Sequence, residues 1–221
     1  MLIAEDLLLL LHDDTSGEAA AGSLSLDYAL AGAVLIELTL LGRLRVVAHE
    51  TGDRLVVIDD SPTGDAVLDT RLALLTGKPV KGKNGVRPVR MVPKLAKDLR
   101  AELLNRLECK GIAHIDRENV LSLSPVSRWP ARDASHELEV RAGLESALKL
   151  GNTPNDRTGV LITLLHAQHV VPKVITGPMG RKALRRRAEQ IATAASSTRE
   201  AVDAIQTGVS AALSQTAPTP A

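Results

Sequence analysis

The chain has 221 residues, of which 44% are hydrophobic and 24% are charged, a balance typical of folded globular proteins and not of disordered or fibrous ones. It contains no Phe, one Trp and one Tyr, so its core must be built from Leu, Val, Ile and Ala. The single cysteine, Cys109, excludes a disulfide within the chain and a thiolate metal site, and it favours a reducing cytoplasm.

The formal net charge of +1 conceals an uneven distribution of charge along the chain. Residues 1–77 contain 13 acidic and 4 basic residues (−9), residues 78–100 contain 1 acidic and 8 basic (+7), and residues 101–221 contain 12 acidic and 15 basic (+3), which together give +1. A concentrated basic segment after an acidic one indicates an anionic partner. The charges alone leave open a solvated basic surface that binds nothing.

The N-terminal segment is apolar, but Glu5 and Asp6 interrupt it. It also lacks basic residues and a small-residue cleavage site, so no signal peptide is predicted. The most apolar stretch, Ala29 to Leu41, is shorter than the roughly 20 residues that span a bilayer, and it contains Glu37. We therefore expect a cytoplasmic protein without a membrane-spanning segment.

Hydrophobic periodicity and turn residues predict two buried helices and a β-hairpin in the first 60 residues. The helices cover Leu2 to Leu11 and a stretch that ends near Leu41, where Gly42 supplies a left-handed stop. The hairpin pairs Leu44–Ala48 with Leu55–Ile58.

A third helix is predicted after the hairpin, with Ser61 as its N-cap and Pro62 at its first position, and it runs to about Thr76.

A basic segment rich in Gly and Pro, residues 78–90, leads into a predicted amphipathic helix that ends near Gly111. Leucines recur at every fourth position of this helix and are expected to face the core: Leu95, Leu99, Leu103 and Leu107. Lys97 and Arg100 lie one turn apart and are expected to be neighbours on its exposed face. A second hairpin is predicted over Ile112 to Leu123, and its apolar edges predict a homo-oligomer.

Three further helices are predicted in the C-terminal half. They cover His136 to Leu150, a stretch from Thr158 or Gly159 to Val171, and a long helix that begins near Arg181 with the cation cluster RKALRRR. We expect one domain over residues 1–205 and a disordered tail over residues 206–221.

The chain lacks the familiar sequence motifs of nucleotide-binding proteins, serine hydrolases and zinc proteases. His166 and His169 are three residues apart on one predicted helix, but no third ligand is evident, so we expect no metal site. These observations predict no catalytic residues and no cofactor, and they favour a binding protein over an enzyme.

Four stretches, in order, resemble the Golgi phosphoprotein 3 family. They are AEDLLLLLHDDTSG at the start, LIELTLLGRL, SPTGDAVLD, and the pair LAKDLRAELLNRLECKGIAHI and NTPNDRTGVLITLLHAQHVV, in which His166 matches a helix histidine of the family. Together they span most of residues 1–175. The composition, rich in Ala, Leu and Arg, fits a bacterial, actinobacterial member.

The resemblance implies a mainly α fold, a compact helical domain with short β-hairpins. Eukaryotic members bind phosphatidylinositol 4-phosphate on Golgi membranes and help retain glycosyltransferases there. The paired cations of their lipid pocket fall on Lys97 and Arg100, and the pocket's Trp and buried Arg fall near Gly22 and on Ala31. Because those last two are not kept, another anionic headgroup is an open alternative.

Physical reasoning supports a headgroup site on the basic segment. Arg grips phosphate oxygens in bidentate fashion, Lys adds a point charge, and each cation near an anionic membrane contributes roughly 1 kcal/mol of attraction. The predicted headgroup-binding residues are Lys97, Arg100, Lys94, Arg90 and Arg87. We expect a peripheral protein on the cytoplasmic face of a membrane, with the tails of membrane proteins as further partners.

Two other functions stay open. A basic helix followed by a hairpin over residues 93–123 has the form of a winged-helix nucleic-acid binder. The chain is not basic overall, however, and lacks aromatic platforms for stacking bases. The second alternative is an adaptor that binds protein tails without a lipid step.

Overall fold

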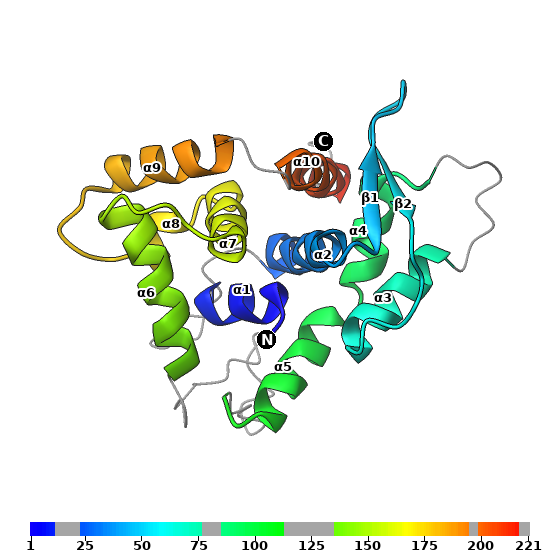
Figure 1. Ribbon diagram of the computed structural model, residues 1–221, viewed down its shortest axis with the longest axis horizontal. Helices are drawn as coiled ribbons and strands as arrows, with labels where there is room; N and C mark the ends of the chain where they lie inside the picture. Colours follow the sequence, from blue (N-terminus) through cyan, green and yellow to red (C-terminus); the bar gives the residue numbers. More distant parts are fainter. Residues whose placement is uncertain (12–22, 77–84, 113–134, 195–198, 217–221) are drawn as a thin grey trace, which may run out of the picture. The chain divides into compact units, whose positions relative to one another are not determined.

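The computed structural model describes residues 1–11, 23–76, 85–112, 135–194 and 199–216. Over these residues the chain is mainly α-helical, as predicted, with one antiparallel pair of strands (Figure 1). The elements in chain order are α1 (Ile3–Leu11), α2 (Ser23–Leu40), β1 (Leu44–Val47), β2 (Arg54–Val57), α3 (Ala66–Thr76), α4 (Pro88–Ala96), α5 (Leu99–Cys109), α6 (Ser135–Lys149), α7 (Asp156–Ala167), α8 (Val171–Val174), α9 (Arg181–Thr193) and α10 (Arg199–Thr216).

The described residues form two compact units, and each unit draws on two separate stretches of the chain. Unit 1 contains Met1–Leu26 and Arg100–Ala194, and unit 2 contains Asp27–Leu99 and Ala195–Ala221. The single domain expected over residues 1–205 stays a prediction.

In unit 1, helix α1 is buried along its whole length, as its sequence predicts. It packs against α6 and α7, and α7 in turn packs against α9, so that α7 lies between α1 and α9 (Figure 1). Leu161, Ile162 and Leu165 of α7 are buried in this packing, and Leu184 of α9 faces inward.

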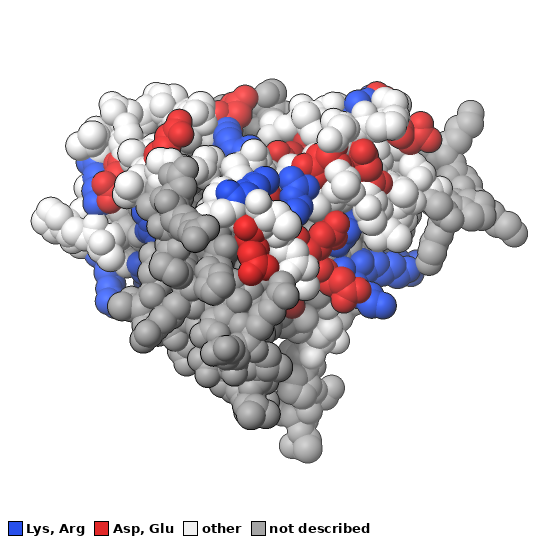
Figure 2. All heavy atoms as spheres, turned by 90° about the horizontal axis from the view of Figure 1, so that it is seen from below, with Lys and Arg blue, Asp and Glu red and all other residues white. Residues whose placement is uncertain are grey.

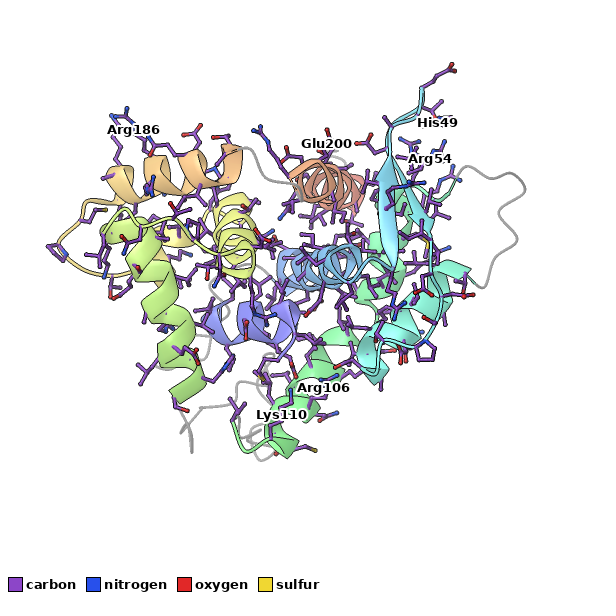
Figure 3. The ribbon with its side chains drawn as sticks, in the orientation of Figure 1. His49, Arg54, Arg106, Lys110, Arg186 and Glu200 are labelled. Carbon is purple, nitrogen blue, oxygen red and sulfur yellow. The ribbon has the colours of Figure 1, made fainter. Side chains whose placement is uncertain are left out.

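The two carboxylates of α1, Glu5 and Asp6, are fully buried in unit 1. An oxygen of Glu5 lies 2.7 Å from Nζ of Lys110 and 3.2 Å from Nε of Arg106, both on the α5 segment (Figure 3). Two cations therefore compensate the buried charge of Glu5 and secure α1 to α5.

The buried charge of Asp6 is compensated by side chains of α6 and α7. Its Oδ2 accepts hydrogen bonds from Nε and a terminal nitrogen of Arg157 at 2.9 and 2.6 Å, and its Oδ1 lies 2.8 Å from Nε2 of His136. Adjacent acids of α1 thus contact α5, α6 and α7, which a pattern of neighbouring residues does not predict.

In unit 2, β1 and β2 pair with Leu44 opposite Val57 and Val47 opposite Arg54, which confirms the predicted first hairpin. Val86 extends this sheet through an antiparallel bridge to Leu55. The second predicted hairpin covers Ile112 to Leu123, and from residue 113 onward it lies outside the described residues. The oligomer contact predicted for this hairpin therefore stays a prediction.

Two glycines of unit 2 lie where neighbouring helices come very close to each other. A Cβ placed on Gly208 of α10 would lie 2.4 Å from Cβ of Pro88 in α4, and one placed on Gly32 of α2 would lie 3.0 Å from a methyl carbon of Val209. Helix α10 therefore packs tightly against both α4 and α2. Residues 29–38 of α2 are all buried, Glu37 among them.

The disordered tail expected over residues 206–221 is wrong for residues 206–216. Helix α10 continues to Thr216, and Gly208, Val209 and Ala212 are buried. The residues of this segment are individually small and weakly apolar, so its burial against α4 was not visible in the sequence. Residues 217–221 lie outside the described part of the chain.

Helix α3 begins at Ala66, four residues later than the start predicted at Pro62. The carboxylate of Asp65 accepts hydrogen bonds from the backbone N–H groups of Val67 and Leu68, at 2.9 and 3.3 Å, and so caps the helix. Ser61, the expected cap, instead accepts a hydrogen bond from Arg43. Asp65 caps the helix in place of Ser61 because it directly precedes the first helical residue.

Helix α7 begins at Asp156, because Asn155 caps it by accepting a hydrogen bond from Thr158 N–H at 2.8 Å. It ends at Ala167, earlier than the predicted Val171, and His169 has a left-handed φ of 58°. The predicted extents of α1, α2, α6 and the start of α9 agree with the structure to within a few residues. Among the described residues, no helix combines the length and apolarity needed to cross a bilayer.

Candidate functional site

Helix α4 carries most of the predicted headgroup-binding residues. Arg87 precedes the helix in an extended conformation, and Pro88 occupies the first helical position, where a missing N–H costs nothing. One face of α4 is buried in unit 2: Pro88, Val89, Met91, Val92, Leu95 and Ala96. The helix is therefore held by its apolar side, and the other side faces solvent.

The solvent-facing side of α4 presents a row of cations, which we call the α4 row: Arg87, Arg90, Lys94 and Lys97. Arg90 and Lys94 are four positions apart within the helix, so their side chains project from the same face, and Arg87 and Lys97 flank the helix at its two ends. Arg90, Lys94 and Lys97 are exposed, and Arg87 is half-buried. No acidic residue occurs between Arg87 and Lys97.

The single helix predicted from about residue 93 to Gly111 is wrong, because the chain breaks at Lys97 and Asp98. Lys97 has a ψ of 126° and Asp98 a left-handed φ of 59°, a conformation that Asp adopts more readily than most residues. Lys97 and Arg100 are therefore not one helical turn apart. The four leucines that predicted the helix are nevertheless all buried.

Buried Arg71 of α3 stabilises the end of α4. It donates hydrogen bonds to the backbone carbonyl oxygens of Leu95, at 3.3 Å, and Lys97, at 3.5 Å. The last carbonyl groups of a helix have no partner within the helix, so Arg71 satisfies two of them. Sequence reasoning missed this residue. The signal was present, as an arginine three residues after Leu68 and four before Leu75, on the buried side of α3.

Arg100 is not part of the α4 row. It is the second residue of α5, it is half-buried, and it belongs to unit 1, whereas the α4 row belongs to unit 2. Ala31, where the resemblance places a pocket arginine, is fully buried in α2, and Gly22 lies outside the described residues. The lipid-binding roles of Lys97, Arg100, Lys94, Arg90 and Arg87 stay predictions.

The described residues contain no group of three or more His, Cys, Asp or Glu side chains that could hold a metal ion. His166 is half-buried near the end of α7, and His169 is exposed beyond that end. Their helical spacing is therefore lost. Cys109 is exposed at the last residue of α5.

Charges of both signs occur on the face drawn in Figure 2, where Lys and Arg lie interspersed with Asp and Glu. Mixed charge of this kind suits solubility and gives no single-sign field.

The sequence model of the family described as Golgi phosphoprotein 3 (GPP34) matches residues 3–205. The chain belongs to the Golgi phosphoprotein 3 family. This family member is also similar to the vacuolar protein sorting-associated protein 74 of Eremothecium gossypii, with 27% identity over 210 residues. That match covers 80% of this chain and 62% of the Eremothecium protein, so the chain spans less than two thirds of that relative's length.

Proposed function

We propose that this Golgi phosphoprotein 3 family member binds anionic phospholipid headgroups, phosphatidylinositol 4-phosphate among them, as a non-enzymatic module on the cytoplasmic face of a membrane. The observation that carries the proposal is the α4 row, which has two cations on the solvent side of a helix whose other side is buried and one cation at each end of that helix. Such a row meets anionic lipid without disturbing the core.

The geometry of the row suits a charged surface. A helix rises 1.5 Å per residue, so the row extends about 15 Å, enough to reach more than one headgroup. Arginine presents a planar fork that matches the oxygens of a phosphomonoester, and lysine adds charge without that directionality. At roughly 1 kcal/mol per cation, four cations give roughly 4 kcal/mol, which favours reversible attachment.

The comparisons support a membrane role. Members of this family are named for the Golgi, and the Eremothecium relative is named for vacuolar protein sorting, which is a process of membranes. Binding to the tails of membrane proteins is a further part of the proposal, because sorting requires cargo as well as a surface.

Liposome flotation tests the proposal. Vesicles of phosphatidylcholine alone, with phosphatidylserine, and with phosphatidylinositol 4-phosphate would be compared for the wild type and the double variant Arg90→Glu and Lys97→Glu. We expect the wild type to float with the anionic vesicles only, and the variant to bind at least about thirtyfold more weakly, because two attractive charges are lost and two repulsive ones are added.

Arg45→Glu is the matched control for the single variant Arg90→Glu, because both arginines are exposed in unit 2 and both changes alter the net charge equally. Equal loss for the two would mean that net charge, and not the α4 row, drives binding. A wild type that shifts duplex DNA at the same salt concentration and ignores vesicles would be a nucleic-acid binder. A wild type that binds only membrane-protein tails would be a lipid-independent adaptor.

A further inference from the structure

The chain segment that leads into α4 lies along the edge of β2 that β1 does not cover. Leu55 and Val86 exchange both backbone hydrogen bonds there, at 2.8 and 2.9 Å. Gly85, with a φ of 64°, permits this approach, because a Cβ at this position would lie 2.3 Å from the carbonyl oxygen of Leu55. Residues next to such an antiparallel pair face each other across the strands, with their side chains on one face. Arg54 and Arg87 are the residues so placed.

Both guanidinium groups extend towards the turn between β1 and β2. Nη2 of Arg54 donates to the hydroxyl oxygen of Thr51 at 2.6 Å. A Cβ placed on Gly52, the next residue, would lie 3.9 Å from Nη2 of Arg87. The N–H of Thr51 donates to Nδ1 of His49 at 3.2 Å, which helps to fix the turn. His49 and Arg54 both belong to this hairpin (Figure 3), whereas Arg87 reaches the turn from a separate part of the chain.

No carboxylate compensates this pair of cations among the described residues, since neither Arg54 nor Arg87 forms an ion pair there. Two acids, Glu50 and Asp53, belong to the same turn but do not contact them. Nε of Arg54 is shielded from solvent and has no acceptor in the described part of the chain. Arg87 also directly precedes α4, whose positive end repels a cation and attracts an anion. Like charges opposed across strands destabilise a sheet, so this arrangement indicates an anionic ligand.

We infer that Arg54 and Arg87 together bind a single phosphate group, either free or as the monoester of a small soluble molecule. We call these two residues the hairpin site. Neighbouring strands are about 4.8 Å apart, so guanidinium groups on opposed residues can each direct two N–H donors at the same oxyanion. A phosphate monoester carries nearly two negative charges at neutral pH and so neutralises both cations, whereas a carboxylate neutralises only one.

Arg54 is the decisive residue for the test, because Arg87 also belongs to the α4 row and Arg54 does not. Isothermal titration calorimetry at constant ionic strength would measure the binding of inorganic phosphate and of glycerol phosphate to the full chain. We expect saturable binding of a single phosphate by the wild type. Arg54→Gln and Arg87→Gln should each bind at least about tenfold more weakly, because charge-assisted hydrogen bonds are lost. Arg54→Lys keeps the charge but loses the bidentate contact, so it should also bind more weakly than the wild type.

Arg186→Gln is the matched control, because Arg186 is an exposed arginine of α9 in unit 1 and its loss changes the net charge equally. This variant should bind phosphate as tightly as the wild type. Thermal unfolding gives a second measurement, since a ligand that binds only the folded state raises the melting temperature. Phosphate should raise that of the wild type more than chloride does at the same ionic strength, and Arg54→Gln should lose the difference. Circular dichroism verifies that each variant is folded.

The outcomes separate the hairpin site from the proposed function, because a soluble phosphate needs no membrane. Weaker phosphate binding by Arg54→Gln, with phosphate binding by Arg186→Gln unchanged, supports the hairpin site whether or not the wild type floats with anionic vesicles. Equal phosphate affinity in Arg54→Gln, Arg186→Gln and the wild type overturns the inference, and so does a wild type that shows no saturable phosphate binding. Flotation that Arg54→Gln weakens, without any binding of soluble phosphate, also overturns it, because Arg54 would then serve a membrane surface.

Discussion

The guanidinium of Arg71 donates a hydrogen bond to the backbone carbonyl oxygen of Leu95, although the two residues are 24 positions apart in the chain. Arg71 is 4% exposed, so its charge is compensated by polar groups of the protein and not by water. The contact places the end of α4, and with it the end of the cation row, in a defined position relative to α3.

Replacing Arg71 with Met should destabilise the protein by about 2–4 kcal/mol. The carbonyl groups of Leu95 and Lys97 would each lose a donor, and an unsatisfied buried polar group costs about 1–3 kcal/mol. Urea denaturation measures the change. Arg45→Met, at an exposed strand position, should alter the free energy of unfolding by less than about 0.5 kcal/mol. Similar changes in the free energy of unfolding for the two variants would show that the Arg71 contacts do not stabilise the protein.

Glu5→Gln should destabilise the protein by about 1.5–3 kcal/mol, because the fully buried carboxylate loses its charge-assisted contacts with Lys110 and Arg106. Thermal unfolding of the variant beside Glu139→Gln, an exposed glutamate of α6, checks the prediction. Two coincident melting curves would contradict the assignment of Glu5 as the anchor of α5.

Gly208→Ala should force α4 and α10 apart. The added Cβ would lie 2.4 Å from Cβ of Pro88 and 3.1 Å from the backbone nitrogen of Val89, so the backbone has to move. Overpacking of this kind costs about 1–3 kcal/mol, more than the better helix propensity of Ala returns. The exposed Ser210→Ala on the same helix is the comparison, and a Gly208 variant as stable as that one would refute the close packing.

Asp69 should contribute to stability in a way that depends on pH. The hydroxyl and the backbone N–H of Thr63 donate hydrogen bonds to its carboxylate, at 2.7 and 2.6 Å, and the hydroxyl bond first of all lowers the pKa of Asp69 below its usual value. A lowered folded pKa means that the contribution is present above the unfolded pKa, about 3.9, and is lost as pH falls through the folded value.

The test compares the free energy of unfolding across the acid range for the wild type, Asp69→Asn and Asp60→Asn. Asp69→Asn should remove part of the stability loss that the wild type shows below about pH 4, whereas Asp60→Asn, at an exposed position in the same loop, should keep the wild-type slope. Parallel curves for all three would rule out a contribution from the Thr63 contact.

Periodicity and turn chemistry are properties of neighbouring residues, and whatever depends on them alone was predictable. The buried helices α1 and α2 and the hairpin of β1 and β2 with Gly42 before it are features of this kind. The burial of Leu95, Leu99, Leu103 and Leu107 was also predictable, because each faces the core whether or not one helix carries them all.

Only the tertiary structure decided the features whose partners are distant in the chain. The break at Asp98 accompanies hydrogen bonds from Arg71, and the burial of Glu5 requires Lys110, 105 positions away. The packing of α10 depends on a glycine of that helix that lies very close to Pro88. A local pattern carries no record of such partners, because the free energy that selects each conformation comes from contacts that exist only once the chain has folded.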